Sequence, residues 1–559
     1  MYSNGIRAII SATALTIATA SYASSFYVAT AGDDGNSGRT ADSPLHTIAT
    51  AANMARPGDT IWLLPGRYRE PVVPPRSGTI DKPITYAKYG QGSVVIVSGS
   101  AASKQAAVYI SGISDIVVNG IDANGGGSPP NAALNSFITI DNSSRITIKN
   151  GEYANANGWW GIGVSNSSSH VIIEDNKVDM VGEWEAPSSR GGTGEGIIVD
   201  QALFPPFQHG NPTYVLVQRN RITHCGHDLV TIGGQFNVAQ DNYLDNDWSD
   251  IRAAPAGYRN AVVFGSDNIF QNNYLTHSGP GPAKYLYDEL LRIEGSNNIV
   301  RHNVLANSYY QAFQSNAGSW TPNGCCNHIY NNTVNQIAAG AWGLYIYPGY
   351  TRSNDVFENN LIVNSRNTPP PANNSNNFLD FALWVKVESL GPTGGAIITG
   401  NMVAPAGGQM PTLFSDAIGK VSLSEPGSAL STNVFSNPVG TPRFAITPVS
   451  SAPTAQLVLN SYALAPDSPA VDQGSFLARI MTTGNSATLP VSDARFFTDG
   501  LGMIPGDTIR LQGSDAVQIT HVNYLDNTIT LARAVAFSAG QGVSLTFSGR
   551  GPYIGAIEP

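Results

Sequence analysis

Carboxylates and arginines recur at matching places in four consecutive apolar segments of the sequence. The segments align on one inward-facing apolar position, which is Val199, Ile232, Val263 and Ile293 in turn. Four residues before that position stand Glu195, Asp228, Arg259 and Glu289. One residue after it stand Asp200, Gly233, Phe264 and Glu294. Because stacked strands lie about 4.8 Å apart, we expect five carboxylates and an arginine to gather along one edge, with Arg292 pointing outward beside Glu294.

This edge offers the groups that glycoside hydrolysis needs. One carboxylic acid protonates the leaving oxygen, and one carboxylate activates water or attacks the sugar. The predicted catalytic residues are Asp228, Glu289, Glu294, Arg259 and His227. We favour Asp228 with Glu289, because two strand spacings, roughly 10 Å between backbones, can bring their carboxyl groups to the separation of an inverting pair. Glu294 with a partner on an adjacent coil is the retaining alternative.

Aromatic residues accompany the charged columns. Aromatic faces pack against sugar rings, while polar groups bind the hydroxyls. The predicted substrate-binding residues are Arg292, Trp159, Trp160, Trp184, Trp248 and Tyr258. Each aromatic can instead be packing in the core or in a loop. The charged columns can likewise be a solvated ladder of ion pairs, in which Arg259 neutralises Asp228 and Glu289.

Calcium is a further candidate ligand of this edge. Glu195 and Asp200 are the predicted calcium ligands, although no compact Asp-rich loop accompanies them. Hydrolysis by two carboxyl groups requires no cofactor, so calcium stays an option and not a requirement.

A repeated phrase predicts the elements that carry these columns. Between about residues 110 and 405, ten short apolar alternations end in Asn, at irregular spacings of some 20 to 45 residues. Val, Ile, Asn and Gly dominate and the periodicity is two, which excludes helical repeats. We therefore predict an all-β fold, a right-handed parallel β-helix, whose recurrent Asn takes the left-handed turn between strands and stacks along the axis.

Two ends of the chain support this fold through a resemblance. The chain resembles secreted parallel β-helix carbohydrate-active enzymes, the pectate lyase-like superfamily. Their first segments are similar to residues 26–38, 57–61 and 65–68, and their last segments are similar to residues 468–474 and 555–558. The resemblance implies an initial strand and an N-terminal capping helix at about residues 45–55. It does not choose a reaction, since lyases, hydrolases and epimerases share this fold.

A second resemblance bears on the reaction. The segment 289–298 is similar to the active-site strand of chondroitinase B and related alginate lyases. That resemblance implies a calcium-binding role for Glu289, but the catalytic lysine position is Glu294, and the catalytic arginine of those enzymes falls near Gln314 or Ser315. Arg259 or Arg292 flanked by carboxylates is held protonated and makes a poor base.

Three functions therefore remain open. A polysaccharide-cleaving glycoside hydrolase is the favoured prediction, and a calcium-dependent polysaccharide lyase acting on a uronate-containing polymer is the first alternative. A non-catalytic carbohydrate-binding or adhesin-like β-helix is the second. All three predict a polysaccharide or oligosaccharide as the partner.

Further sequence features indicate the location of the protein, its domains and the partners it does not bind. Residues 1–23 read as a signal peptide, which predicts a secreted or periplasmic protein. The β-helix is expected over 24–480 and a small β-barrel-like insertion with a closing strand over 481–559. A net charge of −10 without a basic stripe argues against nucleic acid, and no later apolar run predicts a membrane span. We expect a monomer, and the sequence leaves the disulfide state of Cys225, Cys325 and Cys326 open.

Overall fold

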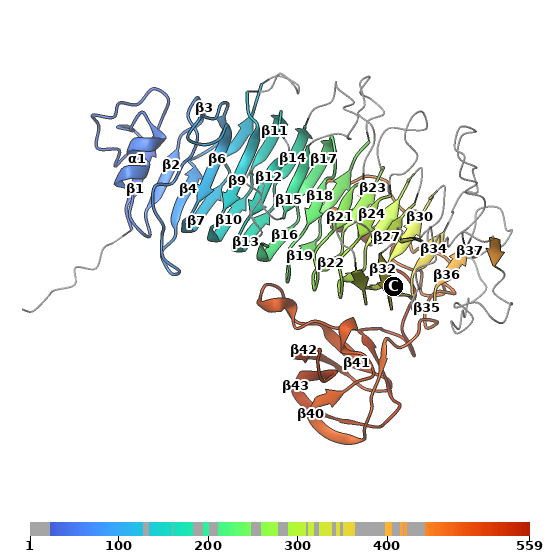
Figure 1. Cartoon of the computed structure of the whole chain (residues 1–559). Coiled ribbons are helices and arrows are strands. Elements are labelled where there is room, and N and C mark those ends of the chain that lie inside the picture. Colours follow the sequence, from blue (N-terminus) through green and yellow to red (C-terminus); the bar gives the residue numbers. More distant parts are fainter. Residues whose placement is uncertain are drawn as a thin grey trace, which may run out of the picture.

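The computed structural model describes most of the chain and is almost entirely β. The described residues are 23–126, 133–158, 160–182, 194–200, 211–247, 259–277, 289–308, 311–317, 323–337, 342–346, 350–363, 397–404, 414–416, 419–421 and 442–559. Their strands wind into a long solenoid, with a C-terminal module along one side (Figure 1). No helix among these residues is long and apolar enough to cross a membrane.

Three parallel sheets form the faces of the solenoid. Sheet A contains β1 Ser25–Val28, β2 Thr60–Leu63, β4 Ile84–Lys88, β7 Ser114–Asn119, β10 Ser144–Lys149, β13 Ser169–Glu174, β16 Thr213–Gln218, β19 Val238–Gln240, β22 Ile269–Gln271, β25 Ile299–Arg301, β29 His328–Tyr330, β33 Val356–Glu358 and β35 Ile397–Thr399. Sheet B contains β3 Gly66–Tyr68, β5 Val94–Ile96, β8 Asp122–Asn124, β11 Glu152–Ala156, β14 Lys177–Val181, β17 Arg221–Cys225, β20 Tyr243–Asp245, β23 Tyr274–Thr276, β26 Val304–Ala306, β30 Thr333–Asn335, β34 Leu361–Val363 and β36 Met402–Ala404. Sheet C contains β6 Ala106–Ser111, β9 Ser136–Asp141, β12 Trp160–Ser165, β15 Glu195–Val199, β18 Val230–Ile232, β21 Ala261–Val263, β24 Leu291–Ile293, β27 Phe313–Ala317 and β31 Trp342–Ile346.

This arrangement is a right-handed parallel β-helix and confirms the predicted fold class. The middle coils contribute one strand to each sheet, while the first and last coils have no strand in sheet C among the described residues, and one continuous apolar core runs inside the coils. Two short pairs lie outside the three sheets, β28 (Asn323–Cys325) with β32 (Thr351–Ser353) and β37 (Phe414–Asp416) with β38 (Gly419–Val421).

The N-terminal coil is capped by α1 (Ile48–Met54), within the predicted range of 45–55. Its N-cap Thr47 accepts a hydrogen bond from the Thr50 amide, as the first turn of a helix requires. Ile48 and Ala51 face the core and close its first coil. The cap therefore covers apolar surface that the solenoid would otherwise expose.

Stacked asparagines bind successive coils together. In one ladder the backbone amide of each asparagine donates to the side-chain oxygen of the asparagine on the next coil. The members of this ladder are Asn176, Asn220, Asn242, Asn273, Asn303, Asn332, Asn360 and Asn401. The predicted stacking is confirmed. Of the recurrent Asn residues, Asn150 has the predicted left-handed conformation, whereas the members of this ladder do not have it. The residue before each takes it, as at Asp175, Arg219, Asp241, Asn272, His302, Asn331 and Asn359. That residue turns the chain, so that the following Asn side chain points into the coil.

The C-terminal segments cover two of the three outer faces. A six-stranded antiparallel sheet comprises β39 (Ala478–Arg479), β40 (Gly484–Pro490), β41 (Thr508–Leu511), β42 (Ala516–Asn523), β43 (Thr528–Phe537) and β44 (Gly542–Leu545). An Ile480–Val491 bridge brings its two edges together in a barrel-like module. The module includes short 3-10 turns at Ala494–Phe496 and Gly500–Gly502.

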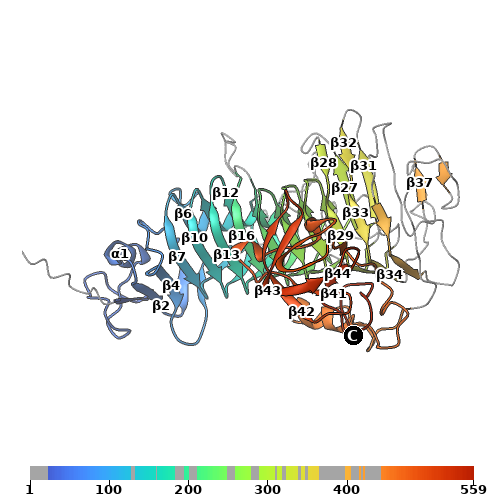
Figure 2. The ribbon, with the colours of Figure 1, turned by 90° about the horizontal axis from the view of Figure 1, so that it is seen from below.

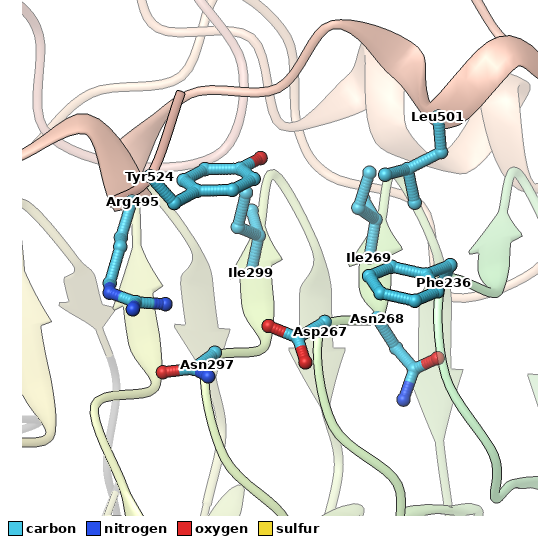
Figure 3. A pocket seen from close by; sticks show the side chains of 9 residues that line it. All are labelled: Phe236, Asp267, Asn268, Ile269, Asn297, Ile299, Arg495, Leu501 and Tyr524. Carbon is cyan, nitrogen blue, oxygen red and sulfur yellow. The ribbon is translucent and has the colours of Figure 1, made fainter. Parts of the chain in front are cut away.

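The module packs on sheet A, while α2 (Ala455–Ser461) packs on sheet B. Figure 2 shows the module alongside the middle and later coils. At the junction, Phe236 and Asp267 of the solenoid lie opposite Leu501 and Tyr524 of the module (Figure 3). Neither of these two apolar contacts includes a described residue of sheet C.

Candidate active site

The charged columns lie on sheet C in the predicted register. Val199 pairs with Ile232, Ile232 with Val263, and Val263 with Ile293, which confirms the alignment on which the columns depend. The glycines that follow are required by close backbone contact. A β-carbon on Gly265 would lie 1.9 Å from the carbonyl oxygen of Gly234, and one on Gly295 would lie 1.8 Å from that of Gly265.

Glu195, His227, Asp228 and Arg259 form one connected group, hereafter the histidine cluster. Asp228 is fully buried, and its Oδ1 accepts a hydrogen bond of 3.0 Å from Arg259 Nε. Its Oδ2 lies 3.3 Å from Arg259 Nη2 and 3.2 Å from His227 Nδ1. The same Nδ1 lies 3.2 Å from Glu195 Oε1, so His227 links two carboxyl groups. Oxygens of Glu195 and Asp228 and a ring nitrogen of His227 all lie within 4.8 Å of one another.

The pKa values of the two carboxyl groups in the histidine cluster are shifted in opposite directions. Burial would raise the pKa of Asp228, but the charges of Arg259 and His227 outweigh it and hold that pKa well below its ordinary value. Burial raises the pKa of Glu195, and its contact with His227 offsets only part of this effect. The cluster thus keeps one carboxylate ionised and favours a proton on the other.

His227 is held in its charged form. Burial would lower its pKa, but Asp228 and Glu195 raise it to about 9. Since Arg259 is charged as well, Asp228 has two cationic partners. Asp228 is therefore firmly ionised and rigidly placed.

Glu289, Arg292 and Glu294 form a second group, hereafter the Arg292 group. Arg292 Nε donates to Oε1 of the fully buried Glu289, and its Nη1 lies 3.7 Å from Glu294 Oε1. Arg292 thus stands beside Glu294, as the sequence indicates. Arg259 forms its ion pair with Asp228, while Glu289 pairs with Arg292, so one arginine does not neutralise both carboxylates by direct contact.

Gln311 and Asn316 continue the two columns on the next coil, and the alignment of four sequence segments did not include them. Ser315 pairs with Ile293, which places Gln311 after Glu289 and Asn316 after Glu294. Glu289 Oε2, Gln311 Nε2 and Asn316 Oδ1 are all buried and have no hydrogen-bond partner within the described part of the chain. Buried polar atoms ordinarily have partners, so this stretch is suited to a polar ligand. Counting four back and one forward from Ser315 would have found both residues.

One predicted aromatic residue lies at this edge. Trp160 pairs with Glu195 in the sheet, is 9% exposed, and donates from Nε1 to Thr139 Oγ1 at 3.2 Å. The other four predicted aromatics lie outside the described residues, namely Trp159, Trp184, Trp248 and Tyr258. Their role in substrate binding stays a prediction.

Glu195 and Asp200, the predicted calcium ligands, do not gather in one group among the described residues, where Glu195 instead lies with His227 and Asp228. Calcium takes six to eight oxygen ligands, whereas Glu195 shares its group with a histidine nitrogen, and the nearby Asp228 already binds a guanidinium. Asp200 Oδ1 lies over the next coil, 2.4 Å from where a β-carbon on Gly233 would be. The arrangement around Glu195 and Asp200 is better suited to proton transfer than to a hard cation.

Comparisons with known sequences found one partial match. No family model matches the chain. One curated relative, the uncharacterized protein YwoF of Bacillus subtilis (strain 168), is 30% identical over 155 residues, which are 27% of this chain and 28% of YwoF. The chain therefore matches little more than a quarter of that relative's length.

Solved structures similar to this chain include several β-helix carbohydrate-active enzymes. Pectate lyase Pel9A has a TM-score of 0.45 and 15% identity, covering 83% of this chain and 94% of its own. The catalytic unit of a GH87 alpha-1,3-glucanase from Streptomyces thermodiastaticus has 0.43 and 11%, covering 66% and 64%. A rhamnogalacturonan lyase has 0.40 and 13%, covering 68% and 87%. These likenesses concern the fold, and the reaction has to be argued from the site.

Proposed function

We propose that this chain cleaves a polysaccharide by hydrolysis on the outer face of sheet C. One observation carries the proposal. Glu195 and Asp228 lie within 4.8 Å of each other at the same histidine, yet burial favours the proton on Glu195 while Arg259 and His227 keep Asp228 ionised. Two carboxyl groups whose environments push their pKa values apart are suited to acid and base roles in one reaction.

In this proposal Glu195 donates its proton to the leaving oxygen of the glycosidic bond. Its side chain is 17% exposed, so it can reach a bound sugar. Asp228 supplies the negative charge that the oxocarbenium-like transition state needs. Carboxyl groups about 5–5.5 Å apart are typical of retaining enzymes, so the short Glu195–Asp228 separation favours retention. The inverting pair predicted from sequence, Asp228 with Glu289, is the rival.

Substrate binding is proposed along the coils that follow the histidine cluster. Within the described residues, one acceptor of Glu289 has no partner, and on the next coil one donor of Gln311 and one acceptor of Asn316 have none. Sugar hydroxyls both donate and accept, and Arg292, whose side chain is 20% exposed, is the member of this stretch that a bound sugar can contact. Trp160 lies at the opposite end of the column, beside Glu195, where its indole can border a sugar ring.

A lyase is the second candidate, and one observation favours it. His227, Arg259 and Arg292 place three cations on this face, and cations stabilise the uronate carboxylate that β-elimination requires. A pKa of about 9 keeps His227 protonated at neutral pH, however, which removes it as the base for the ring proton. Hydrolysis therefore fits the cluster better.

The two reactions are separated by assaying reducing ends and unsaturated-uronide absorbance together on a panel of neutral and acidic polysaccharides. Hydrolysis raises reducing ends without the absorbance, whereas elimination raises both. Proton NMR of the first-formed anomer then reports retention or inversion. Retention supports Glu195 with Asp228, and inversion returns the choice to Asp228 with Glu289.

The setting of the enzyme is also proposed from sequence. We propose that residues 1–23 are removed on secretion and that the mature protein acts as a monomer. N-terminal sequencing of the protein recovered outside the cytoplasm tests the first statement. Light scattering on the purified chain tests the second.

A further inference from the structure

Cys325 and Cys326 are adjacent in the chain, and their sulfur atoms lie 2.6 Å apart. Non-bonded heavy atoms pack at about 3.5–4.0 Å, and a disulfide bond is about 2.05 Å long. The separation of the two sulfurs is therefore closer to the length of a bond than to that of a packing contact. We infer that Cys325 and Cys326 form a disulfide between neighbouring residues when the protein meets a thiol–disulfide oxidant.

The surrounding backbone holds the two side chains together. The amide of Cys325 donates to Ser296 Oγ at 3.1 Å, and the amide of Cys326 donates to the carbonyl of Ser353 at 3.0 Å. Cys326 takes a left-handed conformation with φ of 62°. Cys325 ends β28, and Cys326 is the left-handed residue that follows it. The backbone of the pair is therefore fixed on both sides, so a small side-chain rotation is enough to bring the two sulfurs to bonding distance.

Other partners and roles fit the pair less well. Burial and the neighbouring Cys325 raise the pKa of Cys326 to about 12, so this group is a thiol at neutral pH and a poor metal ligand. Cys225 is fully buried at the end of β17 on sheet B, whereas Cys325 ends β28 several coils later. A bridge from Cys225 to either partner would require the solenoid to rearrange.

The bond forms by two exchange steps with an external disulfide, for which oxidised glutathione serves as the probe. One cysteine sulfur attacks the probe and releases one glutathione thiol, and the second cysteine displaces the other. Each cysteine loses one proton, the probe gains two electrons, and one S–S bond replaces another. Adjacent α-carbons are about 3.8 Å apart, closer than in ordinary disulfides, so we expect this bond to be reduced readily.

The turn that carries the pair also borders the candidate site. A β-carbon on Gly324 would lie 2.5 Å from Arg352 Nη1 and 2.8 Å from the carbonyl oxygen of Glu294. That Arg352 nitrogen also donates to the carbonyls of Glu294 and Asn316. The bond would thus fix a turn packed against the backbone of the Arg292 group. Because it closes almost no chain, its effect on unfolding should be small.

Mass spectrometry of the full-length protein tests this inference. Trypsin places both cysteines in the peptide of residues 302–352 and Cys225 in that of 222–252, which serves as the internal standard. After treatment with oxidised glutathione, protein denatured and alkylated without reduction should carry one label, on Cys225. The 302–352 peptide should be unlabelled and lighter by two hydrogens, and reduction should restore two labels.

The variant Cys325→Ser is the matched control, since Cys326 should then be labelled or carry glutathione. Two labels on the unreduced 302–352 peptide of the wild-type protein would overturn the inference. So would a cross-link between this peptide and 222–252, or between two copies of 302–352.

Discussion

Two buried arginine–aspartate pairs lie on different outer faces of the solenoid. On sheet A, Arg301 binds Asp507 of the module through two nitrogens, at 2.8 and 2.6 Å. On sheet C, Arg259 binds Asp228 through two nitrogens, at 3.0 and 3.3 Å. Their partners raise the pKa of both arginines although burial opposes it. A buried arginine–aspartate ion pair therefore does not by itself distinguish a structural contact from a candidate active site.

The neighbours of the two pairs differ. Arg301 Nε donates to Gln271 and its Nη1 to the Tyr330 hydroxyl, while Asp507 also accepts from the Thr498 amide. These neighbours are uncharged, and they complete the hydrogen bonds of the pair. Asp228 instead contacts His227, which is shared with Glu195. The sheet A pair joins two parts of the fold, whereas the sheet C pair contacts a histidine that is shared with a second carboxyl group.

The largest effect that separates the two faces is expected for Glu195→Gln. If Glu195 donates the proton, the amide should lower kcat by about 10²–10⁴-fold. Stability should change little, because burial already favours the uncharged form of Glu195. Initial rates on an active polysaccharide, with urea unfolding of the same samples, measure both.

Glu152→Gln is the matched control for that variant. Glu152 is an exposed sheet B residue that pairs with Lys177, and its side chain is 65% exposed. It should keep wild-type activity. Full activity in Glu195→Gln would remove Glu195 from the mechanism.

The next largest effect is the loss of stability when Asp507 or Asp228 is replaced. Asp507→Ala leaves Arg301 buried without its counter-charge, which costs about 3–5 kcal/mol. Asp228→Ala should cost a similar amount, because Arg259 and His227 lose the same kind of partner. Only Asp228→Ala should also abolish activity per folded molecule. Equal activity in both variants would assign the histidine cluster a purely structural role.

The fold and the columns could be predicted from sequence because backbone hydrogen bonds and apolar periodicity determine them. Periodicity two and the recurrent Asn fix the coils, and the alignment on Val199, Ile232, Val263 and Ile293 follows from the inward apolar face. Which arginine binds which carboxylate could not be predicted, since Arg259 and Arg292 each lie near more than one acid. The choice depends on side-chain directions and on where each loop returns.

Which outer faces the C-terminal segments cover could also not be predicted from the sequence. Val238, Ile269 and Ile299 look like ordinary strand residues, yet they lie outside the coil and pack on the module. Pairing of the module with sheet A depends on contacts more than 200 residues apart in the chain, such as Arg301 with Asp507. Local patterns carry no information about such a contact.

A smaller effect is the loss of stability on sheet C at alkaline pH. The pKa of His227 is raised in the folded state to about 9, above the ordinary 6.5. Its contribution is therefore fully present below pH 6.5 and is lost as pH rises through about 9. His227→Gln should lack this loss, and the stability difference between the two proteins should narrow by about 1–3 kcal/mol across that window. Urea unfolding at pH 6 and pH 9.5 measures it, and a constant difference would contradict the assignment.

A second pH-dependent effect is expected under the module on sheet A, at Glu358. Burial raises the pKa of this side chain to about 8, and the nearby Asp493 adds to the shift. Since the folded pKa lies above the ordinary 4.5, the stabilising contribution is present below pH 4.5 and is lost as pH rises through about 8. Glu358→Gln cannot ionise, so it should gain on the order of 3–5 kcal/mol relative to wild type between pH 4.5 and pH 9, since one pKa unit corresponds to about 1.4 kcal/mol.

The titration of His227 is common to both proteins and cancels in this difference. Combining Glu358→Gln with His227→Gln should therefore give additive changes, because the two groups lie on different faces and share no partner. Unfolding curves of the four proteins over this pH range test the additivity. Strong coupling would mean that the module-covered face and the candidate site respond to pH as one unit, which would break the distinction between the two faces.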